Sequence, residues 1–221
     1  RSMGAEIEGD GTEVIRIQGK TSLNGANHEV IGDRIEAGTF LAATMATGGQ
    51  VLVRGIQPVF LDSVLDKMAA AGAEITREAN AIGIKMNGRP QGIDFSTSPF
   101  PGFPTDMQAQ LMAALTVAEG PSLITETIFE NRFMHVPELT RLGADLTIRG
   151  NTVMVRGKNE LVGAPLMATD LRASASLVIG GLVARGETQV SRIYHLDRGY
   201  EKMEAKLKSL GAQIERVAGE E

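Results

Sequence analysis

The sequence predicts a threefold α/β (α+β) fold with helices inside and sheets outside, and two observations carry this prediction. The first is a glycine-alanine-x-aliphatic phrase that recurs about every 70 residues, as expected of one supersecondary unit used several times. It reads GAEI at residues 4–7 and 72–75, GADL at 143–146 and GAQI at 211–214. The second is one helix per unit that is apolar on nearly every side, which is typical of a helix buried in a core.

Each predicted inner helix begins at an aspartate and ends at a glycine. The sequences are DRIEAGTFLAATMATGG from Asp33, DMQAQLMAALTVAEG from Asp106 and DLRASASLVIGGLVARG from Asp170. Aspartate favours a helix N-terminus and glycine a C-terminus. Their alanine, glycine and threonine residues would let neighbouring helix backbones approach closely.

The second helix of each unit, at about residues 58–71, 133–142 and 198–210, mixes charges with an apolar stripe and is predicted to lie outside. Short alternating strands at 51–53, 82–86 and 153–155 complete the units, with hairpin turns near Asn80 and Asn151. The repeats then span about residues 20–90, 91–158 and 159–221.

The segment EVIRIQG at residues 13–19 is a predicted strand without a unit of its own. It belongs either to the tail of a neighbouring lobe, residues 1–19, or it completes the last hairpin after Ala212. The chain opens on Arg1 and is out of phase with its repeat at both ends, so we expect a piece of a longer protein.

Composition narrows the function. A formal net charge of −5 argues against nucleic acid or an anionic membrane as partner, and no apolar run approaches the ~20 residues of a membrane span. The absence of cysteine excludes disulfides, thiolate metal sites and a cysteine nucleophile within this chain. The three histidines are far apart in sequence, so no metal is predicted. We expect no cofactor, and no signal peptide is visible.

The three aspartates have two possible interpretations. Asp33 with Glu36, and Thr105 with Gln108, match capping boxes, which would make these residues purely structural. Alternatively, three parallel helices direct their N-termini at one face, where partial positive charge and free N–H groups would bind an anion.

Four arginines favour the anion site. A lone arginine is usually a solvated surface group, but four at matching ends of repeated units suggest shared phosphate or carboxylate binding. They are Arg34, Arg132, Arg172 and Arg198.

Five blocks spread over the chain resemble one known family. They are GDRIEAGTF from Gly32, FPTDMQAQ from Phe103, ITETIFENRFMHVPEL from Ile124, MATDLRASASL from Met167 and RIYHLDRGYE from Arg192. Together they resemble the UDP-N-acetylglucosamine enolpyruvyl transferases (1-carboxyvinyltransferases). The resemblance implies two lobes, each an inside-out α/β barrel of three βαβαββ units, with the active site between them. This chain would be one lobe plus the tail of the other, inactive alone because the family's catalytic cysteine lies in the missing lobe.

The resemblance also implies a cytoplasmic transferase for peptidoglycan synthesis. It would move the enolpyruvyl group of phosphoenolpyruvate to the 3-hydroxyl of UDP-N-acetylglucosamine and release phosphate, without a metal. Asp106 would accept the hydroxyl proton and bind the sugar, while Ile128, through its backbone, and Phe129 would contact the nucleotide sugar. Arg198 would bind phosphate, and Arg132 and Arg172 would lie near the carboxylate. Asp170 would handle protons or orient an arginine, and Asp33 and Arg34 would form a cleft ion pair.

Two other classes stay open. The chain could be a UDP-sugar-binding or regulatory module without catalysis, or the repeat could be scaffold only. Clustering of the site residues on one face would count against the scaffold. These residues are Asp106, Arg132, Asp170, Arg172 and Arg198.

Overall fold

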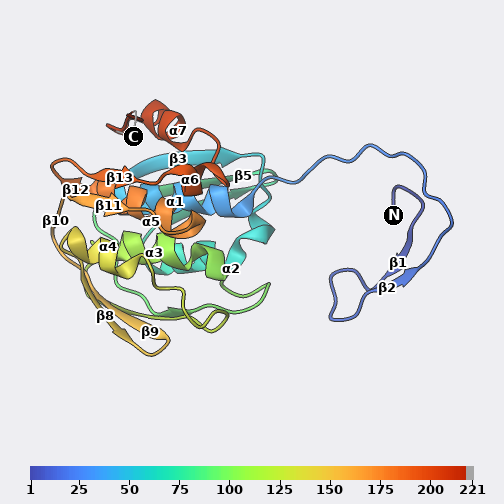
Figure 1. Ribbon diagram of the computed structural model, residues 1–221, viewed down its shortest axis with the longest axis horizontal. Helices are drawn as coiled ribbons and strands as arrows, with labels where there is room; N and C mark the ends of the chain where they lie inside the picture. The colour runs from blue at the N-terminus through green and yellow to red at the C-terminus, as the bar shows by residue number, and fades with distance from the viewer. Residues whose placement is uncertain (218–221) are drawn as a thin grey trace. The chain divides into compact units, whose positions relative to one another are not determined.

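The computed structural model describes residues 1–217 in two compact units, Arg1–Ile31 and a second that begins at Gly32 (Figure 1). In the first unit, β1 (Glu6–Glu8) pairs antiparallel with β2 (Arg16–Gln18), and Ile7 lies opposite Ile17. Residues 212–217 form no strand, and the alternative assignment of residues 13–19, to the tail of a neighbouring lobe, stays a prediction. A short hairpin closes at a smaller entropic cost than a long-range pairing.

Three inner helices form the centre of the second unit, as the sequence predicted. They are α1 (Arg34–Thr47), α3 (Gln108–Leu115) and α5 (Leu171–Val183), and each packs against the other two. All of α3 is buried. Gly38 of α1 faces Met107 so closely that an added Cβ would lie 2.8 Å from its sulfur, which shows why small residues recur here.

Sheets flank these helices, with β3 and β5 on one side and β8 and β9 on the other (Figure 1). The first repeat has the antiparallel order β3-β5-β4, and the second has β6-β7-β9-β8 with β6 parallel to β7. The third has two parallel pairs, β10-β12 and β11-β13. The bounds are β3 (Gly49–Arg54), β4 (Glu74–Glu78), β5 (Ala81–Met86), β6 (Phe95–Ser96), β7 (Pro121–Thr125), β8 (Asp145–Arg149), β9 (Thr152–Arg156), β10 (Leu161–Val162), β11 (Pro165–Met167), β12 (Ala184–Arg185) and β13 (Gln189–Ser191).

Alternation fixes which face of each sheet meets the helices. In β9, Val153 and Val155 are fully buried while Arg156 is exposed. The predicted hairpin turns are confirmed, since β4 joins β5 at Asn80 and β8 joins β9 at Asn151. This mixed α/β architecture confirms the predicted fold class.

The outer helices are shorter than predicted. They are η1 (Pro58–Phe60), α2 (Asp62–Ala70), α4 (Val136–Arg141), α6 (Tyr194–Asp197) and α7 (Met203–Ser209). The predicted helix over 198–210 begins only at Met203, because Lys202 has a left-handed backbone with φ 46°. Just before it, Gly199 packs on Leu171, where an added Cβ would lie 2.8 Å from a methyl carbon. No helix within residues 1–217 is both long and apolar enough to cross a membrane.

Candidate active site

The aspartates that precede the inner helices have two different roles. Asp33 caps α1 by accepting from the Ile35 and Glu36 amides at 2.8 and 3.3 Å. Asp170 caps α5 by accepting from the Arg172 and Ala173 amides, both at 2.8 Å. Asp106 lies in the short helix η2 (Thr105–Met107), and in the described part of the chain its carboxylate caps no helix. The capping interpretation therefore holds for Asp33 and Asp170 and fails for Asp106.

The Asp106 carboxylate is held between two arginines. Arg132 Nη2 donates to Asp106 Oδ1 at 2.6 Å, and Arg172 Nη2 lies 3.7 Å from Asp106 Oδ2. The side chain of Asp106 is 41% exposed, whereas those of Arg132 and Arg172 are 23% and 15% exposed. A carboxylate has about four lone-pair positions, so Asp106 keeps open positions toward solvent. The cluster presents one accessible base flanked by two partly buried cations.

Thr105 links this cluster to a buried glutamate. Arg132 Nη1 donates to Thr105 Oγ1 at 2.7 Å, and Thr105 donates its own hydrogen to Glu126 Oε2 at 2.9 Å. This use of the Thr105 hydroxyl replaces the predicted capping box with Gln108. A hydroxyl carries one hydrogen and two lone pairs, so the chain of bonds has one direction. Arg132 is thereby fixed at both terminal nitrogens.

Glu126 organises the loop that carries Arg132. It is 1% exposed, and its Oε1 accepts from Thr97 Oγ1 and from the Ile128 and Phe129 amides at 2.8, 2.8 and 3.2 Å. Because the Ile128 amide is occupied by Glu126, its carbonyl is the backbone group left for a ligand. Arg132 lies 4.8 Å above the Phe129 ring, a cation–π distance.

Two polar residues essential to this geometry were not singled out from the sequence. Glu126 lies in the polar run ITETIFENRF. Tyr200, whose hydroxyl accepts from Arg172 Nη1 at 3.2 Å, lies in the block RIYHLDRGYE. A carboxylate within a polar loop was the available signal for Glu126. Nothing in the local pattern of Tyr200 indicated that its hydroxyl would be buried.

His135 is buried close enough to Asp170 and Arg132 for both charges to act on its pKa. It is 2% exposed, and its Nε2 has no hydrogen-bond partner among the described residues. Burial lowers the pKa of His135 from 6.5 to about 4, while Asp170 acts to raise it and Arg132 to lower it further. The imidazole is therefore neutral at pH 7.

Acidification should destabilise the protein through His135. Below pH 6.5 the unfolded chain binds a proton at this residue, whereas the folded chain does so only near pH 4. The neutral histidine therefore contributes stability above pH 6.5, and this contribution is lost as the pH falls to 4. The loss lowers the free energy of unfolding by about 3 kcal/mol. The free energy of unfolding, measured with urea from pH 7 to 4, should fall less steeply in His135→Gln than in His28→Gln. The second variant is the control, because His28 is exposed. If the free energy of unfolding falls equally steeply with pH in both variants, His135 is not the group responsible.

The remaining predicted residues lie apart from the Asp106 contacts. Within the described residues, Asp33 and Arg34 form no ion pair; Asp33 caps its helix, and Arg34 lies 5.6 Å above the Phe100 ring. The two side chains therefore do not pair with each other among these residues, and their place in a cleft between two lobes stays a prediction. Arg198 is exposed at the end of α6 and makes no side-chain hydrogen bond or ion pair with any described residue. Asp170 joins the cluster only through its bond to the Arg172 amide.

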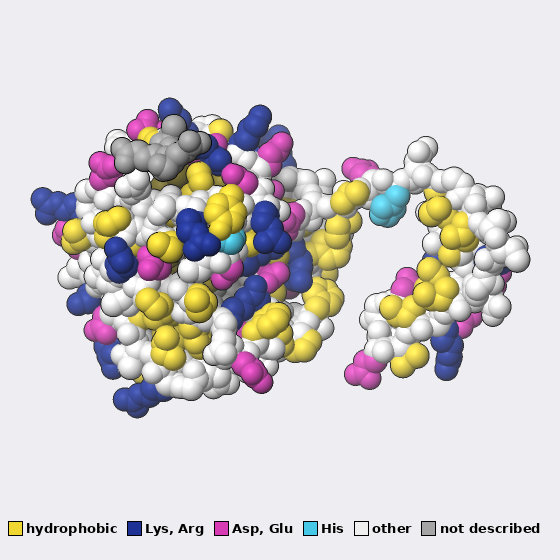
Figure 2. Space-filling model, viewed as in Figure 1, with side chains coloured by type: hydrophobic (Ala, Val, Ile, Leu, Met, Phe, Trp, Pro, Cys, Tyr) yellow, Lys and Arg dark blue, Asp and Glu magenta, His cyan; other side chains and the backbone are white. Residues whose placement is uncertain are grey.

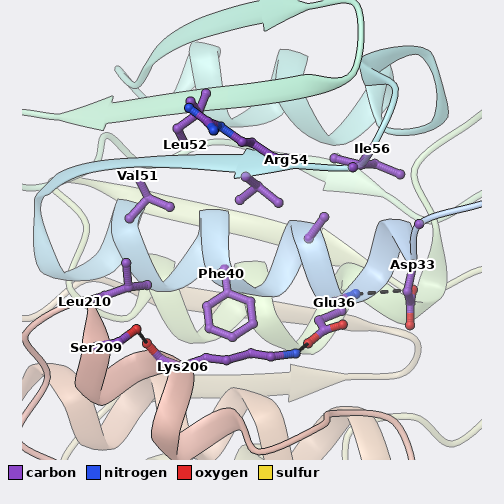
Figure 3. Close-up of a pocket in the computed structure, with 14 residues that line it drawn as sticks. Asp33, Glu36, Phe40, Val51, Leu52, Arg54, Ile56, Lys206, Ser209 and Leu210 are labelled. Atoms are coloured by element: carbon purple, nitrogen blue, oxygen red, sulfur yellow. Dashed lines mark hydrogen bonds and ion pairs between the residues drawn. The ribbon is translucent and has the colours of Figure 1, made fainter.

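Asp33 instead lines a different pocket, of about 370 Å³, between α1, β3 and α7. In Figure 3, Lys206 of α7 reaches Glu36 of α1 alongside Phe40, with a nitrogen–oxygen distance of 2.7 Å. Both residues line the pocket. Figure 2 shows positive and negative side chains interspersed over the visible face, without one dominant charge.

Comparison with known proteins places this geometry in a family. The family profile of EPSP synthase (3-phosphoshikimate 1-carboxyvinyltransferase) matches residues 1–207. The chain belongs to the EPSP synthase family. The enolpyruvyl transferase NikO from Streptomyces tendae is similar with 28% identity and a TM-score of 0.85, over 96% of this chain and 51% of that one. EPSP synthase from Acinetobacter baumannii shares the fold at 20% identity and a TM-score of 0.77, over 98% of this chain and 54% of that one.

Membership of the EPSP synthase family confirms the broader prediction of an enolpyruvyl transferase relative. The chain spans about half the length of the solved structures it matches. Asp106, Arg132 and Arg172 come from the second and third repeats and meet at the N-terminal ends of α3 and α5. No group of three or more histidine and carboxylate side chains in residues 1–217 could hold a metal ion.

Proposed function

We propose that this chain is one half of an enolpyruvyl transferase of the cytoplasm, with phosphoenolpyruvate as donor and UDP-N-acetylglucosamine as acceptor. The observation that carries the proposal is the accessible Asp106 carboxylate held between Arg132 and Arg172. The five sequence blocks support the sugar nucleotide as acceptor, and the complete protein would then make a peptidoglycan precursor.

The proposed reaction needs a base and fixed cations. The acceptor hydroxyl oxygen bonds to C2 of phosphoenolpyruvate, its proton passes to a base, and C3 gains a proton to give a tetrahedral intermediate. Loss of a C3 proton and of phosphate then restores the enol ether. Asp106 supplies the carboxylate, because a general base must lie within hydrogen-bond reach of the hydroxyl, and its open face allows this. The absent half would supply the other groups of the site.

The cations are unequal in their availability for an anionic substrate. Arg132 donates through both terminal nitrogens, to Thr105 and Asp106. Among residues 1–217, Arg172 makes one side-chain hydrogen bond, to Tyr200 at 3.2 Å, and its contact with Asp106 is a longer ion pair. A guanidinium has five N–H donors, so Arg172 keeps more of them for the carboxylate of phosphoenolpyruvate. Exposed Arg198 stays our proposed phosphate ligand, and Ile128 and Phe129 the contacts of the nucleotide sugar.

A binding module without catalysis is the alternative function. It is favoured by the chain's coverage of only 51% of NikO. The scaffold interpretation is weaker, because a half-exposed carboxylate flanked by two partly buried arginines contributes little to stability.

Titration of the 221-residue chain tests the proposed acceptor. Calorimetry and amide NMR should show saturable binding of UDP-N-acetylglucosamine that Asp106→Ala weakens. Shikimate 3-phosphate, the acceptor implied by the name of the family, is the comparison ligand. Tighter binding of shikimate 3-phosphate would overturn the acceptor assignment. A folded chain that binds neither ligand would contradict the proposal that this half recognises the acceptor.

A further inference from the structure

A buried polar network joins the N-terminal halves of the three inner helices beneath Asp106. Its centre is Tyr200, which is 1% exposed and lies between α6 and α7. The Tyr200 hydroxyl lies 3.0 Å from Thr39 Oγ1 of α1 and accepts from Gln110 Nε2 of α3 at 3.3 Å. It also accepts from Arg172 Nη1 of α5 at 3.2 Å.

The hydrogens of this network can be placed by counting donors. The Thr39 hydroxyl donates its single hydrogen to the Ile35 carbonyl at 2.8 Å, so it can only accept from Tyr200. The Tyr200 hydroxyl therefore donates to Thr39 and accepts from Arg172. Gln110 Nε2 has two hydrogens for three acceptors, so one goes to the Asp106 carbonyl and the other is shared between Thr39 and Tyr200. The donation to Thr39 and the acceptance from Arg172 together fix the orientation of the Tyr200 hydroxyl.

Gln110 connects the same network to the main chain of the proposed base. Its Nε2 donates to the Asp106 carbonyl at 2.8 Å, and it also contacts Thr39 Oγ1 at 3.2 Å. The backbone of Asp106 and the guanidinium of Arg172 are thus held by groups that share Tyr200. Between these two groups lies the 3.7 Å separation of Arg172 Nη2 from Asp106 Oδ2.

That distance matters because Arg172 does not hydrogen-bond to Asp106. Its Nη2 is 3.7 Å from Oδ2, while its Nη1 is held by Tyr200 and its guanidinium carbon lies 5.6 Å from the ring centroid. Without the hydroxyl, Arg172 would be free to close onto the carboxylate. It would then have fewer donors left for an anion.

We propose that Tyr200 is a positioning residue whose buried hydroxyl, fixed by Thr39 and Gln110, keeps Arg172 apart from Asp106 and available to the carboxylate of phosphoenolpyruvate. The inference rests on the proposed function for the identity of the anion. The placement of Arg172 stands on the network alone, so the two can be tested separately.

The first test is NMR of the Arg172 guanidinium, assigned with Arg172→Lys. In the native chain the bond to Tyr200 should slow guanidinium rotation, and in Tyr200→Phe the rotation should become fast. The matched control is Tyr194→Phe, because this other tyrosine is exposed and its hydroxyl contacts Arg192 instead. Thr39→Ser should keep the slow rotation, and Thr39→Val should lose it. Unchanged rotation in Tyr200→Phe would overturn the inference.

The second test is titration with phosphoenolpyruvate. Tyr200→Phe should weaken its binding roughly tenfold, as expected for loss of a hydrogen bond to a charged group, and should leave UDP-N-acetylglucosamine binding within about twofold. Equal weakening of both ligands, or of neither, would overturn the positioning role. If the native chain shows slow Arg172 rotation that depends on Tyr200 but binds no phosphoenolpyruvate, the placement is supported and the proposed donor site on this half is contradicted. Urea unfolding of each variant confirms that it is folded.

Discussion

Replacing Asp106 with asparagine should lower the turnover of the complete transferase by about 10²–10⁴-fold, the usual contribution of a positioned base. Asparagine keeps the shape of the side chain and can still accept from Arg132, but it cannot take the proton of the acceptor hydroxyl. The free energy of unfolding should fall by no more than about 1 kcal/mol, because Asp106 is 41% exposed and exposed ion pairs contribute little. Steady-state kinetics and urea unfolding check the two values.

The chain offers a matched control for this experiment. Asp145 is also 41% exposed and pairs with Arg156 at 3.3 Å, but on the β8-β9 hairpin. Asp145→Asn should change the free energy of unfolding by a similarly small amount and leave turnover within about twofold, because it removes only an exposed ion pair. If Asp106→Asn instead lowers stability strongly and leaves turnover near normal, Asp106 is structural.

The sequence predicted the centre of the fold because its signals there are local. Apolar residues all round the inner helices and aspartates before two of them indicated α1 and α5 closely. The inner helix of the second repeat was predicted to continue to Gly120, but α3 ends at Leu115. Just beyond it, Arg89 donates to the Val117 and Ala118 carbonyls at 2.8 and 2.7 Å. Such a long-range contact has no signature in the local pattern.

The candidate site was predictable only in part, for the same reason. Matching positions in the repeats brought Asp106, Arg132 and Arg172 into one hypothesis, and the structure places them in contact. The same pattern could not separate Asp33, which caps a helix, from Asp106, which does not. Glu126 and Tyr200 act through bonds to distant segments, so their partners are visible only in three dimensions.

Replacing Glu126 with alanine should destabilise the protein by about 2–4 kcal/mol, the largest stability effect we expect at the site. Its carboxylate is 1% exposed and accepts from two hydroxyls and two amides. Removal leaves these donors unpaired, and each buried unpaired group costs about 1–3 kcal/mol unless water reaches it. The loop that bears Arg132 should loosen at the same time. Urea unfolding and amide hydrogen exchange of residues 126–132 measure the two effects.

Glu126→Gln separates loss of the acceptor from loss of volume. Its carbonyl oxygen can replace Oε1 and keep the bonds from Thr97, Ile128 and Phe129, while its NH₂ group would face Thr105. The Thr105 hydroxyl, which donates to Glu126 and accepts from Arg132, would then have to turn away. We expect the free energy of unfolding to fall by about 1 kcal/mol, because the bond from Thr105 is replaced by an NH₂ group facing a hydroxyl. The contact of Arg132 with Asp106 should weaken as well. If Glu126→Ala and Glu126→Gln each lower the free energy of unfolding by less than about 1 kcal/mol, the hydrogen bonds of Glu126 do not hold the loop. The loop is then held by its apolar contacts, and Arg132 is positioned by Phe129.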